Sequence, residues 1–384
     1  MQKRFAPDEG GVFPEWEEVT LGDIAEFSRG KGLTKKDVSE KGERKCLLYG
    51  QLQVRYGTII KNVTGMTDVE LKNPVLSKSG DVLISGTISA GLAKASCIKE
   101  DGVIIGGDIN ILRPKEGIDG EFLARAINAN TKKFKRFLEG SVILHLKNEN
   151  IKEVSIRIPK SIEEQRKIAA ALAAYDEMIA VKTAKLETWQ ECKKRMVKEI
   201  FGRTKRFRDD DGNEFPEWEE KTLGTIVSIT TGKLNANEMV DGGQFDFYTS
   251  GVDVFKIDKA AFNGPAITVA GNGANVGCLH LADGKFNAYQ RTYVLQDFLA
   301  CREYIYAAIE VKLPNVIKKY KRGSAIPYIV IDMLADLKIP LPCMEEQQKI
   351  GSFLAEIDKE IQIQKEFIKT YAEGKKRMMR ELME

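Results

Sequence analysis

The sequence contains one unit twice, and this internal duplication constrains the fold more than any other feature. The first set of matches lies 202 residues apart: Phe13–Glu18 with Phe215–Glu220, Thr20–Gly22 with Thr222–Gly224, and Gly30–Lys31 with Gly232–Lys233. The second set lies 182 residues apart: Glu163–Ile168 with Glu345–Ile350, and Lys193–Met196 with Lys375–Met378. This period far exceeds that of a solenoid repeat, so each copy is predicted to be a folded domain with an appendage.

Both copies end in a pattern typical of a coiled-coil helix, because apolar residues recur at alternating spacings of four and three. The predicted seam comprises Ile168, Leu172, Ile179, Leu186, Trp189 and Met196 in the first copy, and Ile350, Leu354, Ile357, Ile361, Ile368 and Met378 in the second. Polar residues interrupt it at matching places, Lys182 and Lys193 in one copy and Gln364 and Lys375 in the other. Such interruptions fix register and partner choice. We expect two helices of roughly 38 residues, about 57 Å long, paired antiparallel.

The sequence ahead of each helix indicates mixed α and β structure. Short β-branched or apolar runs bounded by glycine predict strands at residues 81–86, 102–107, 265–271 and 292–295. Helical periodicity covers residues 121–138 and 299–321. The predicted fold class is therefore α+β, with globular domains at residues 1–157 and 203–338 and spacer helices at 158–202 and 339–384. The first domain is the longer one by about 20 residues in its diverged middle.

Basic charge gathers at one place in each copy, although the formal net charge is only +3. The clusters are Lys132, Lys133, Lys135 and Arg136 around Phe134, and Lys318, Lys319, Lys321 and Arg322 around Tyr320. Lysine and arginine bind phosphates with release of counterions, so these residues are predicted to contact a nucleic-acid backbone. A further basic run between Lys193 and Arg208 fits either a DNA path or a solvated linker.

Loops with amide, guanidinium and phenol side chains are candidates for reading base edges, because these groups form the hydrogen bonds that distinguish bases. They comprise Gln51, Gln53, Arg55 and Tyr56 in the first copy, and Asn272, Asn275, Gln290 and Arg291 in the second. The same residue types are also common in ordinary loops.

Other function classes find little support. The six cysteines form no C-x-x-C pair, which is typical of reduced thiols in the cytoplasm, and no membrane or secretion segment is predicted. Gly271–Gly277 resembles a dinucleotide fingerprint, but an apolar strand follows it, so a tight turn is favoured. His145 and His280 each lie among leucines and are expected to be packed rather than catalytic. We expect neither a metal site nor a cofactor in this chain.

An ordered set of motifs occurring twice resembles the specificity (S) subunit of type I restriction-modification systems, over nearly all of residues 14–382. The set comprises the openings Trp16–Ile24 and Trp218–Ile226, the Gly-Ser pairs Gly140–Ser141 and Gly323–Ser324, and Glu-Glu-Gln-x-Lys-Ile shortly after a proline. The resemblance implies two target recognition domains, each reading one half of a bipartite site in double-stranded DNA. It also implies helices that fix the spacing and bind two methyltransferase (modification) subunits. S-adenosylmethionine would then belong to those partners, and ATP and Mg to a restriction (translocase) subunit.

Three alternatives stay open at this point. A subunit of a type IIB-like system would have the same sequence features and differ only in its partner. A coiled-coil scaffold without DNA binding would carry the basic clusters as mere surface. A self-sufficient nuclease is the third alternative, although no motif concentrates the residues it would need.

Overall fold

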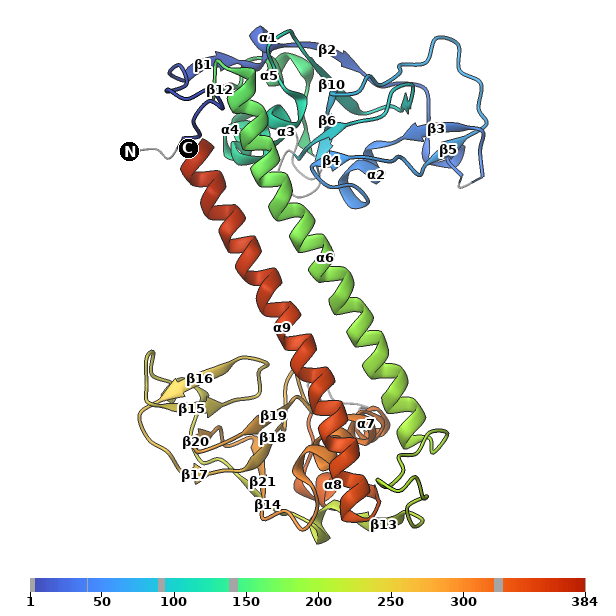
Figure 1. Ribbon diagram of the computed structural model, residues 1–384, viewed down its shortest axis with the longest axis vertical. Helices are drawn as coiled ribbons and strands as arrows, with labels where there is room; N and C mark the ends of the chain where they lie inside the picture. The colour runs from blue at the N-terminus through green and yellow to red at the C-terminus, as the bar shows by residue number, and fades with distance from the viewer. Residues whose placement is uncertain (1–3, 40, 89–93, 138–143, 321–326, 384) are drawn as a thin grey trace. The chain divides into compact units, whose positions relative to one another are not determined.

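The chain forms two compact units, residues 1–181 with 367–384, and residues 182–366. The computed structural model describes residues 4–39, 41–88, 94–137, 144–320 and 327–383. The two long helices, α6 (Ile162–Phe201) and α9 (Met344–Met383), each contain 40 residues and contribute to both units (Figure 1). The division therefore runs through the helices, whereas the sequence suggested helical segments separate from the globular domains.

The first unit is built on a main sheet of five strands, and its other strands form smaller sheets. Its strands are β1 (Glu17–Thr20), β2 (Ala25–Arg29), β3 (Arg44–Leu47), β4 (Ile59–Ile60), β5 (Met66–Thr67), β6 (Val82–Ser85), β7 (Thr87–Ile88), β8 (Ala95–Ile98), β9 (Ile104–Ile105), β10 (Ile109–Pro114), β11 (Leu144–His145) and β12 (Ser155–Ile158). Its shorter helices are α1 (Leu21–Ile24), α2 (Tyr49–Val54), α3 (Gly120–Ala129), α4 (Thr131–Phe134) and α5 (Asn148–Lys152), with 3-10 turns at Lys35–Asp37 and Lys135–Phe137. The main sheet has the order β2-β10-β6-β8-β4, and smaller sheets join β5-β3-β9, β1-β12 and β11-β7.

Both faces of this main sheet are buried, because alternate residues of a strand point to opposite sides. Val82 and Ile84 of β6 pack with Phe122 and Ile127 of α3 in one core. Leu83, between them, belongs to a second core that includes Leu52 of α2. The sheet is thus covered by α3 on one face and by α2 with the small β5-β3-β9 sheet on the other.

The second unit repeats this plan with fewer strands. Its strands are β13 (Glu219–Thr222), β14 (Ser228–Thr231), β15 (Phe245–Tyr248), β16 (Val254–Ile257), β17 (Phe262–Asn263), β18 (Ala266–Ala270), β19 (Leu279–Ala282), β20 (Lys285–Ala288), β21 (Thr292–Gln296) and β22 (Lys338–Leu341). Its shorter helices are α7 (Arg302–Tyr320) and α8 (Ile331–Ala335), with 3-10 turns at Leu223–Thr225 and Ala236–Glu238. The sheets have the orders β14-β21-β18-β19, β16-β15-β20-β17 and β13-β22.

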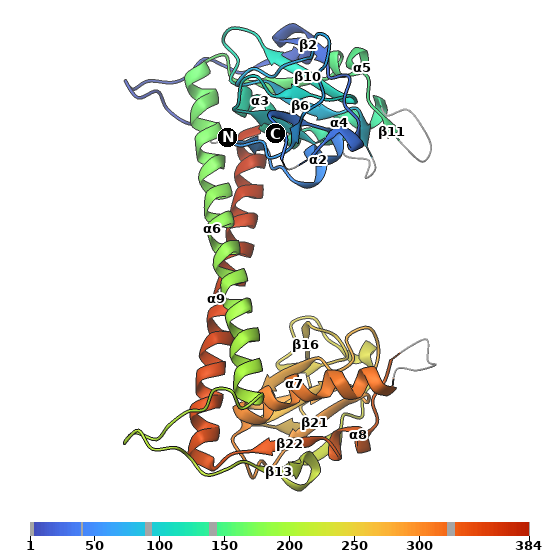
Figure 2. The same ribbon diagram turned by 90° about the vertical axis from the view of Figure 1, so that its right-hand side faces the viewer.

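Four strands of the main sheet correspond one by one, since β2-β10-β6-β8 and β14-β21-β18-β19 are antiparallel throughout in the same order. Ile267 and Val269 of β18 pack with Ile305 of α7, which covers this sheet in Figure 2. On the other face, Ala266 packs with Phe286 of β20. The longer middle of the first copy lies between β2 and β6, where it adds α2 and β4. The predicted α+β class with two pseudo-symmetric domains is confirmed.

Close backbone contact explains one pair of repeated glycines. A Cβ on Gly30 would lie 2.1 Å from the carbonyl oxygen of Gly106, and a Cβ on Gly232 would lie 1.9 Å from that of Ala288. Both distances are far below van der Waals contact, so no other residue fits without moving the backbone. The Gly-Lys match between the copies therefore marks the same crossing of two segments.

The long helices run antiparallel in each unit. In the first unit, Tyr175 of α6 contacts Tyr371 of α9, with ring centroids 6.4 Å apart. Further back along α6, Ile168 shares a core with Leu382, which lies further forward along α9. In the second unit the Nζ of Lys193 lies 2.8 Å from a carboxylate oxygen of Asp358. The expected antiparallel pairing of the two helices is confirmed within each unit.

All positions of the predicted seam are buried or partly buried, whereas the helix residues between them are mostly exposed. Two of the four polar seam residues, Lys193 and Lys375, have acidic partners. Lys375 pairs with Asp176, and Lys193 pairs with Asp358 and Glu310. Asp176 and Asp358 are themselves 182 residues apart, so the same lysine–aspartate pair recurs in both copies. Among the described residues, none of the helices combines the length and apolar character needed to cross a bilayer.

Candidate nucleic-acid interface

Matching backbone hydrogen bonds form the same frame at one end of the main sheet in both units. In the first unit the N–H of Gly86 donates to the Asp108 carbonyl at 2.7 Å, and the N–H of Leu146 donates to the Gly86 carbonyl at 2.9 Å. In the second unit Gly271 donates to Arg291 at 2.8 Å and Ile329 donates to Gly271 at 2.9 Å. Asp108 therefore corresponds to Arg291, and His145 corresponds to Tyr328.

Three of the predicted base readers of the second unit lie around this frame. Gln290 and Arg291 line a pocket of about 450 Å³, and Asn272 directly follows Gly271 in its wall. The other lining residues are Tyr293, Tyr328, Ile329 and Val330. Asn275 is exposed in the turn between β18 and β19, away from this pocket lining.

The amide readers of this pocket also make contacts within the protein. The Asn272 Oδ1 accepts a hydrogen bond from the Ser250 hydroxyl at 2.7 Å, and the Gln290 Nε2 donates to the Asn235 Oδ1 at 3.1 Å. Burial raises the pKa of Tyr293, against which the nearby charge of Arg291 acts in the opposite direction. The Tyr293 hydroxyl donates to the Ile329 carbonyl at 2.9 Å, which fixes its ring in the wall of the pocket.

The predicted readers of the first unit lie elsewhere, on α2 and just after it. The Gln51 Oε1 accepts a hydrogen bond from the Leu48 N–H at 3.0 Å, so this side chain caps α2. The Tyr56 hydroxyl accepts from the Thr64 N–H at 3.0 Å, and Arg55 is exposed. The side chain of Gln53 is outside the described part of the structure. The two predicted sets of readers therefore do not occupy equivalent positions.

The first basic cluster is exposed on α4 and the turn after it. Lys132, Lys133, Lys135 and Arg136 are all exposed, whereas Phe134 between them is fully buried. The Lys133 Nζ donates to the Ser155 carbonyl at 3.0 Å, beside β12. The Arg136 guanidinium lies over the Phe137 ring, 4.6 Å from its centroid. The buried aromatic residue thus anchors the cluster and leaves its charges at the surface.

The second basic cluster occupies the corresponding place. Lys318 and Lys319 are exposed at the end of α7, and Lys319 lines a pocket with Lys338 of β22, the equivalent of Ser155. Lys321 and Arg322, and the Gly-Ser pairs after both clusters, lie outside the described residues. The two lysine pairs are thus placed alike in the two units, and their contact with phosphate stays a prediction.

Three basic residues of the run from Lys193 to Arg208 form ion pairs within the second unit: Lys193, Arg206 and Arg208. Lys193 binds Glu310 and Asp358. Burial alone would lower the pKa of Lys193, but the hydrogen bonds that it donates to these acids outweigh this effect, so the pKa is raised. Arg208 pairs with Glu214 at 3.0 Å. These contacts favour the linker interpretation over a DNA path for these three residues.

The two histidines have different surroundings. His145 is exposed, so the expectation that it is packed was wrong; it follows from strand alternation, since its neighbour Leu146 takes the buried side. His280 is half-buried, and its Nε2 lies 3.2 Å from the Gly251 carbonyl. In the described part of the chain no three His, Cys, Asp or Glu residues gather as metal ligands would.

The family model described as "Type I restriction modification DNA specificity domain" matches the chain twice, at residues 14–188 and 216–370. The chain belongs to this family. Each match runs from the Phe-Pro-Glu-Trp-Glu-Glu segment of one copy into the long helix that follows it. The two copies are therefore two specificity domains.

Relatives support this assignment. The chain is 35% identical over 146 residues to the "Type I restriction enzyme EcoDI specificity subunit" of Escherichia coli, a match that covers 37% of this chain and 32% of that protein. It is 23% identical over 428 residues to the "Type I restriction enzyme MjaVIII specificity subunit" of Methanocaldococcus jannaschii, covering 100% of this chain and 95% of the relative. The fold is similar to the crystal structure of the type I restriction-modification S subunit from M. genitalium, with a TM-score of 0.75 at 17% identity over 96% of both chains.

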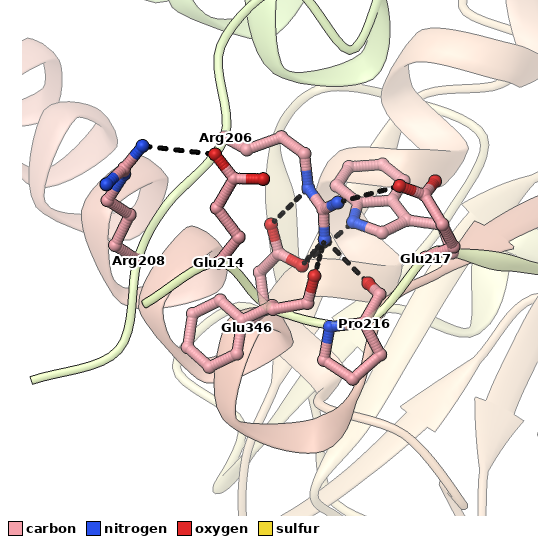
Figure 3. A network of polar contacts seen from close by, with 8 residues as sticks. Arg206, Arg208, Glu214, Pro216, Glu217 and Glu346 are labelled. Atoms are coloured by element: carbon pink, nitrogen blue, oxygen red, sulfur yellow. Dashed lines mark hydrogen bonds and ion pairs between the residues drawn. The ribbon is translucent and has the colours of Figure 1, made fainter. Parts of the chain in front are cut away.

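The repeated Glu-Glu-Gln-x-Lys motif of the specificity domains has a structural role that sequence reasoning missed. In the second domain Glu346 is fully buried and accepts hydrogen bonds from the Arg206 guanidinium at 2.9 Å and from the Trp218 Nε1 at 2.9 Å (Figure 3). Arg206 also donates to the Pro216 carbonyl at 2.6 Å. The hydrogen bond with Glu346 raises the pKa of Arg206. We call this group the second clamp.

The first domain contains the same arrangement, the first clamp. Arg4 donates to both carboxylate oxygens of Glu164, at 3.0 and 2.9 Å, and the Trp16 Nε1 donates to Glu164 at 3.2 Å. Gln165 and its equivalent Gln347 accept from the backbone N–H of Asp119 and Cys301, each at 2.9 Å. A signal was available, because Arg4-Phe5 recurs as Arg206-Phe207 at the 202-residue offset.

Proposed function

We propose that this protein is the DNA-recognition subunit of a type I restriction-modification complex. Each specificity domain reads one half of a bipartite site in double-stranded DNA, and α6 and α9 set the distance between the halves. The observation that carries the proposal is a pair of specificity domains with one backbone frame and different side chains at its end. Asp108 and His145 stand in one domain where Arg291 and Tyr328 stand in the other.

Different side chains at equivalent positions favour an asymmetric site. Two identical readers related by a two-fold axis would select inverted copies of one half-site, as symmetric dimers do. Here the aspartate is paired with Arg29 of its own domain, whereas the arginine keeps its donors, so the two domains present different groups at equivalent positions. The two half-sites are therefore different sequences separated by a gap that neither domain contacts.

Chemistry in the complex belongs to the partners. Two methyltransferase subunits dock on the helices, bind S-adenosylmethionine and methylate adenine at N6, and a restriction subunit uses ATP and Mg. The chain itself contributes recognition and not catalysis. Its two lysine pairs, Lys132–Lys133 and Lys318–Lys319, hold the phosphate backbone and position the domains on the duplex.

The test is co-expression with the methyltransferase that accompanies this chain, followed by mapping of N6-methyladenine across a plasmid library. Methylation confined to one split motif with two different halves is expected. A stable complex that leaves every adenine unmodified would contradict the proposal and favour a scaffold without DNA binding. Methylation of an inverted repeat would contradict its asymmetric part alone.

A further inference from the structure

The equivalent positions 108 and 291 differ in what surrounds them. In the first domain the Asp108 carboxylate is already occupied: it accepts a hydrogen bond from Arg29 at 2.6 Å and another from the Thr87 hydroxyl. Its charge is neutralised by this ion pair, and only 22% of its side chain is exposed. The first domain therefore closes this position with groups of its own.

The second domain leaves the same position open. The residue 202 positions after Arg29 is Thr231, which has no charge to pair with position 291. Arg291 is exposed, and across the described residues its guanidinium has no hydrogen bond or ion pair. An arginine without an internal partner retains all five of its donors for a ligand.

The surroundings of Arg291 suit a planar acceptor-rich ligand. Arg291 lines a pocket of about 450 Å³ together with two aromatic residues, Tyr293 and Tyr328. Tyr328 is 53% exposed, and Val330, two residues further along the chain, is 40% exposed. Gln290 adds an amide at the same rim. A charge flanked by an amide and exposed apolar surface is typical of recognition of base edges rather than of a bare phosphate contact.

The position of the phosphate-binding candidates agrees with this arrangement. The turn from Asn272 to Gly277 joins the pocket to the basic end of α7. At one end, the Gly273 N–H donates to the Pro327 carbonyl at 3.1 Å, next to Tyr328. At the other end, Gly277 packs so closely on Ile317 that a Cβ would lie 2.7 Å from its Cδ1. Lys318 follows Ile317 directly. The candidate phosphate contact of Lys318 and the candidate base contacts of the pocket therefore lie at the two ends of one turn.

We propose that Arg291 is a specificity-determining residue that reads a guanine in the half-site of the second domain. Two guanidinium N–H groups donate to the O6 and N7 of that guanine in the major groove, the pairing that planar arginine forms best. Gln290 and Tyr328 border the bound base pair. The inference rests on the proposed function and adds to it the identity of one base and of the residue that reads it.

The experiment uses the complete complex with its methyltransferase and a pool of DNA with randomised half-sites. Methylation by the wild-type chain is compared with Arg291→Ala and with the control Lys285→Ala, which removes one exposed charge from β20 of the same domain. The wild type is expected to require a guanine at one position of one half-site. Arg291→Ala is expected to reduce that preference by roughly 5- to 150-fold, with the other half-site and the gap unchanged. Lys285→Ala should match the wild type.

Several results would overturn the inference while the proposed function stands. One is a wild-type motif in which the half-site read by the second domain has no guanine in either strand. Another is an Arg291→Ala motif identical to that of the wild type. A third is an equal loss of methylation on all sequences, which would make Arg291 a phosphate contact or a structural residue.

Arg291→Lys covers the case in which the alanine variant fails to fold. It keeps the charge but not the planar fork, so it should weaken the guanine preference while the total affinity for DNA keeps its salt dependence. Full retention of the preference by lysine would overturn the inference. If instead the wild-type complex methylates no split motif at all, the proposed function itself fails, which is a distinct outcome.

Discussion

Glu346 shows how much one buried carboxylate holds together in the second unit. It accepts hydrogen bonds from Arg206 and Trp218, and both donors would lose a charged partner on its removal. We expect Glu346→Ala to lower the free energy of unfolding of this unit by about 3 kcal/mol, because hydrogen bonds to a buried charge are lost. Urea unfolding, monitored by hydrogen exchange of peptides from residues 203–338, measures this change in the free energy of unfolding.

The neighbouring residue supplies the control. Glu345 is exposed and, among the described residues, pairs with Lys349 alone, at 3.7 Å, so Glu345→Ala is expected to change the free energy of unfolding by less than about 0.5 kcal/mol. Similar losses in the two variants would show that the second clamp does not stabilise the fold.

Cys97 is protected from alkylation by its surroundings. Its residue is fully buried, and this burial raises the pKa of the thiol to about 12. Because the thiolate is the reactive species, iodoacetamide at pH 8 should leave Cys97 unmodified in the folded protein and modify it in urea. Cys343, which is partly exposed, is the internal control and should react in the folded state. Mass spectrometry of the two peptides measures the extent of alkylation of each thiol. Rapid modification of Cys97 in the folded protein would show that this residue is not buried.

At the scale of elements, local patterns were read correctly from the sequence and distant contacts were not. The long helices follow from a four-three spacing that needs no knowledge of the rest of the fold. The clamps could not be predicted from local spacing, because Arg4 and Glu164 are 160 residues apart in the chain. In the sequence, Glu164 cannot be distinguished from an exposed glutamate of a helix. Likewise, strand alternation places His145 and Leu146 on opposite faces, but the sequence alone does not show which face packs on the core.

The pairing of Lys193 with Asp358 and Glu310 makes the stability of the second unit depend on pH. Lys193 has a pKa raised above its ordinary value of 10.5, so its contribution is complete below that value and is lost as pH rises through the folded pKa. We expect the wild type to lose stability as pH rises above 10.5, and Lys193→Met to lose less over the same interval. Urea unfolding below and above pH 10.5 measures the difference.

Lys193→Met is also expected to lower the free energy of unfolding at neutral pH, since Asp358 and Glu310 would lose their shared partner. Lys194→Met serves as the control, because Lys194 is exposed beside Lys193 on the same helix. The pH dependence of this control should follow the wild type. A Lys193→Met variant with an unchanged alkaline slope would show that the ion pairs do not stabilise the helix pairing.

At the scale of the whole molecule, duplication allowed the architecture to be predicted and divergence limited the prediction of the site. Two copies with shared ends imply the same fold twice, and the structure shows corresponding sheets and helix junctions. The residues at the ends of the frames cannot be aligned by sequence, because the segments between β2 and β6 and between β14 and β18 differ in length. Asp108 and Arg291 became comparable only through their matching backbone hydrogen bonds.

The placement of the lysine pairs leads to a prediction for binding by the complete chain. Lys133 and Lys319 occupy equivalent positions, one in each domain, so both are expected to contact phosphate on one duplex at the same time. Each phosphate contact contributes about 0.9 to the slope of log K against log salt concentration. Lys133→Ala with Lys319→Ala should therefore reduce that slope by roughly 2, and should weaken binding to specific and non-specific DNA equally.

The matched control is Lys72→Ala with Lys285→Ala, which removes one exposed lysine from each domain outside the two clusters. Affinities of the methyltransferase complex for DNA at several salt concentrations give both slopes. If the control lowers the slope as much as the cluster variant, the effect is one of total charge. Because net charge acts over distances comparable to the Debye length while a phosphate contact acts at one place, only a difference between the two variants assigns the contact to the lysine pairs.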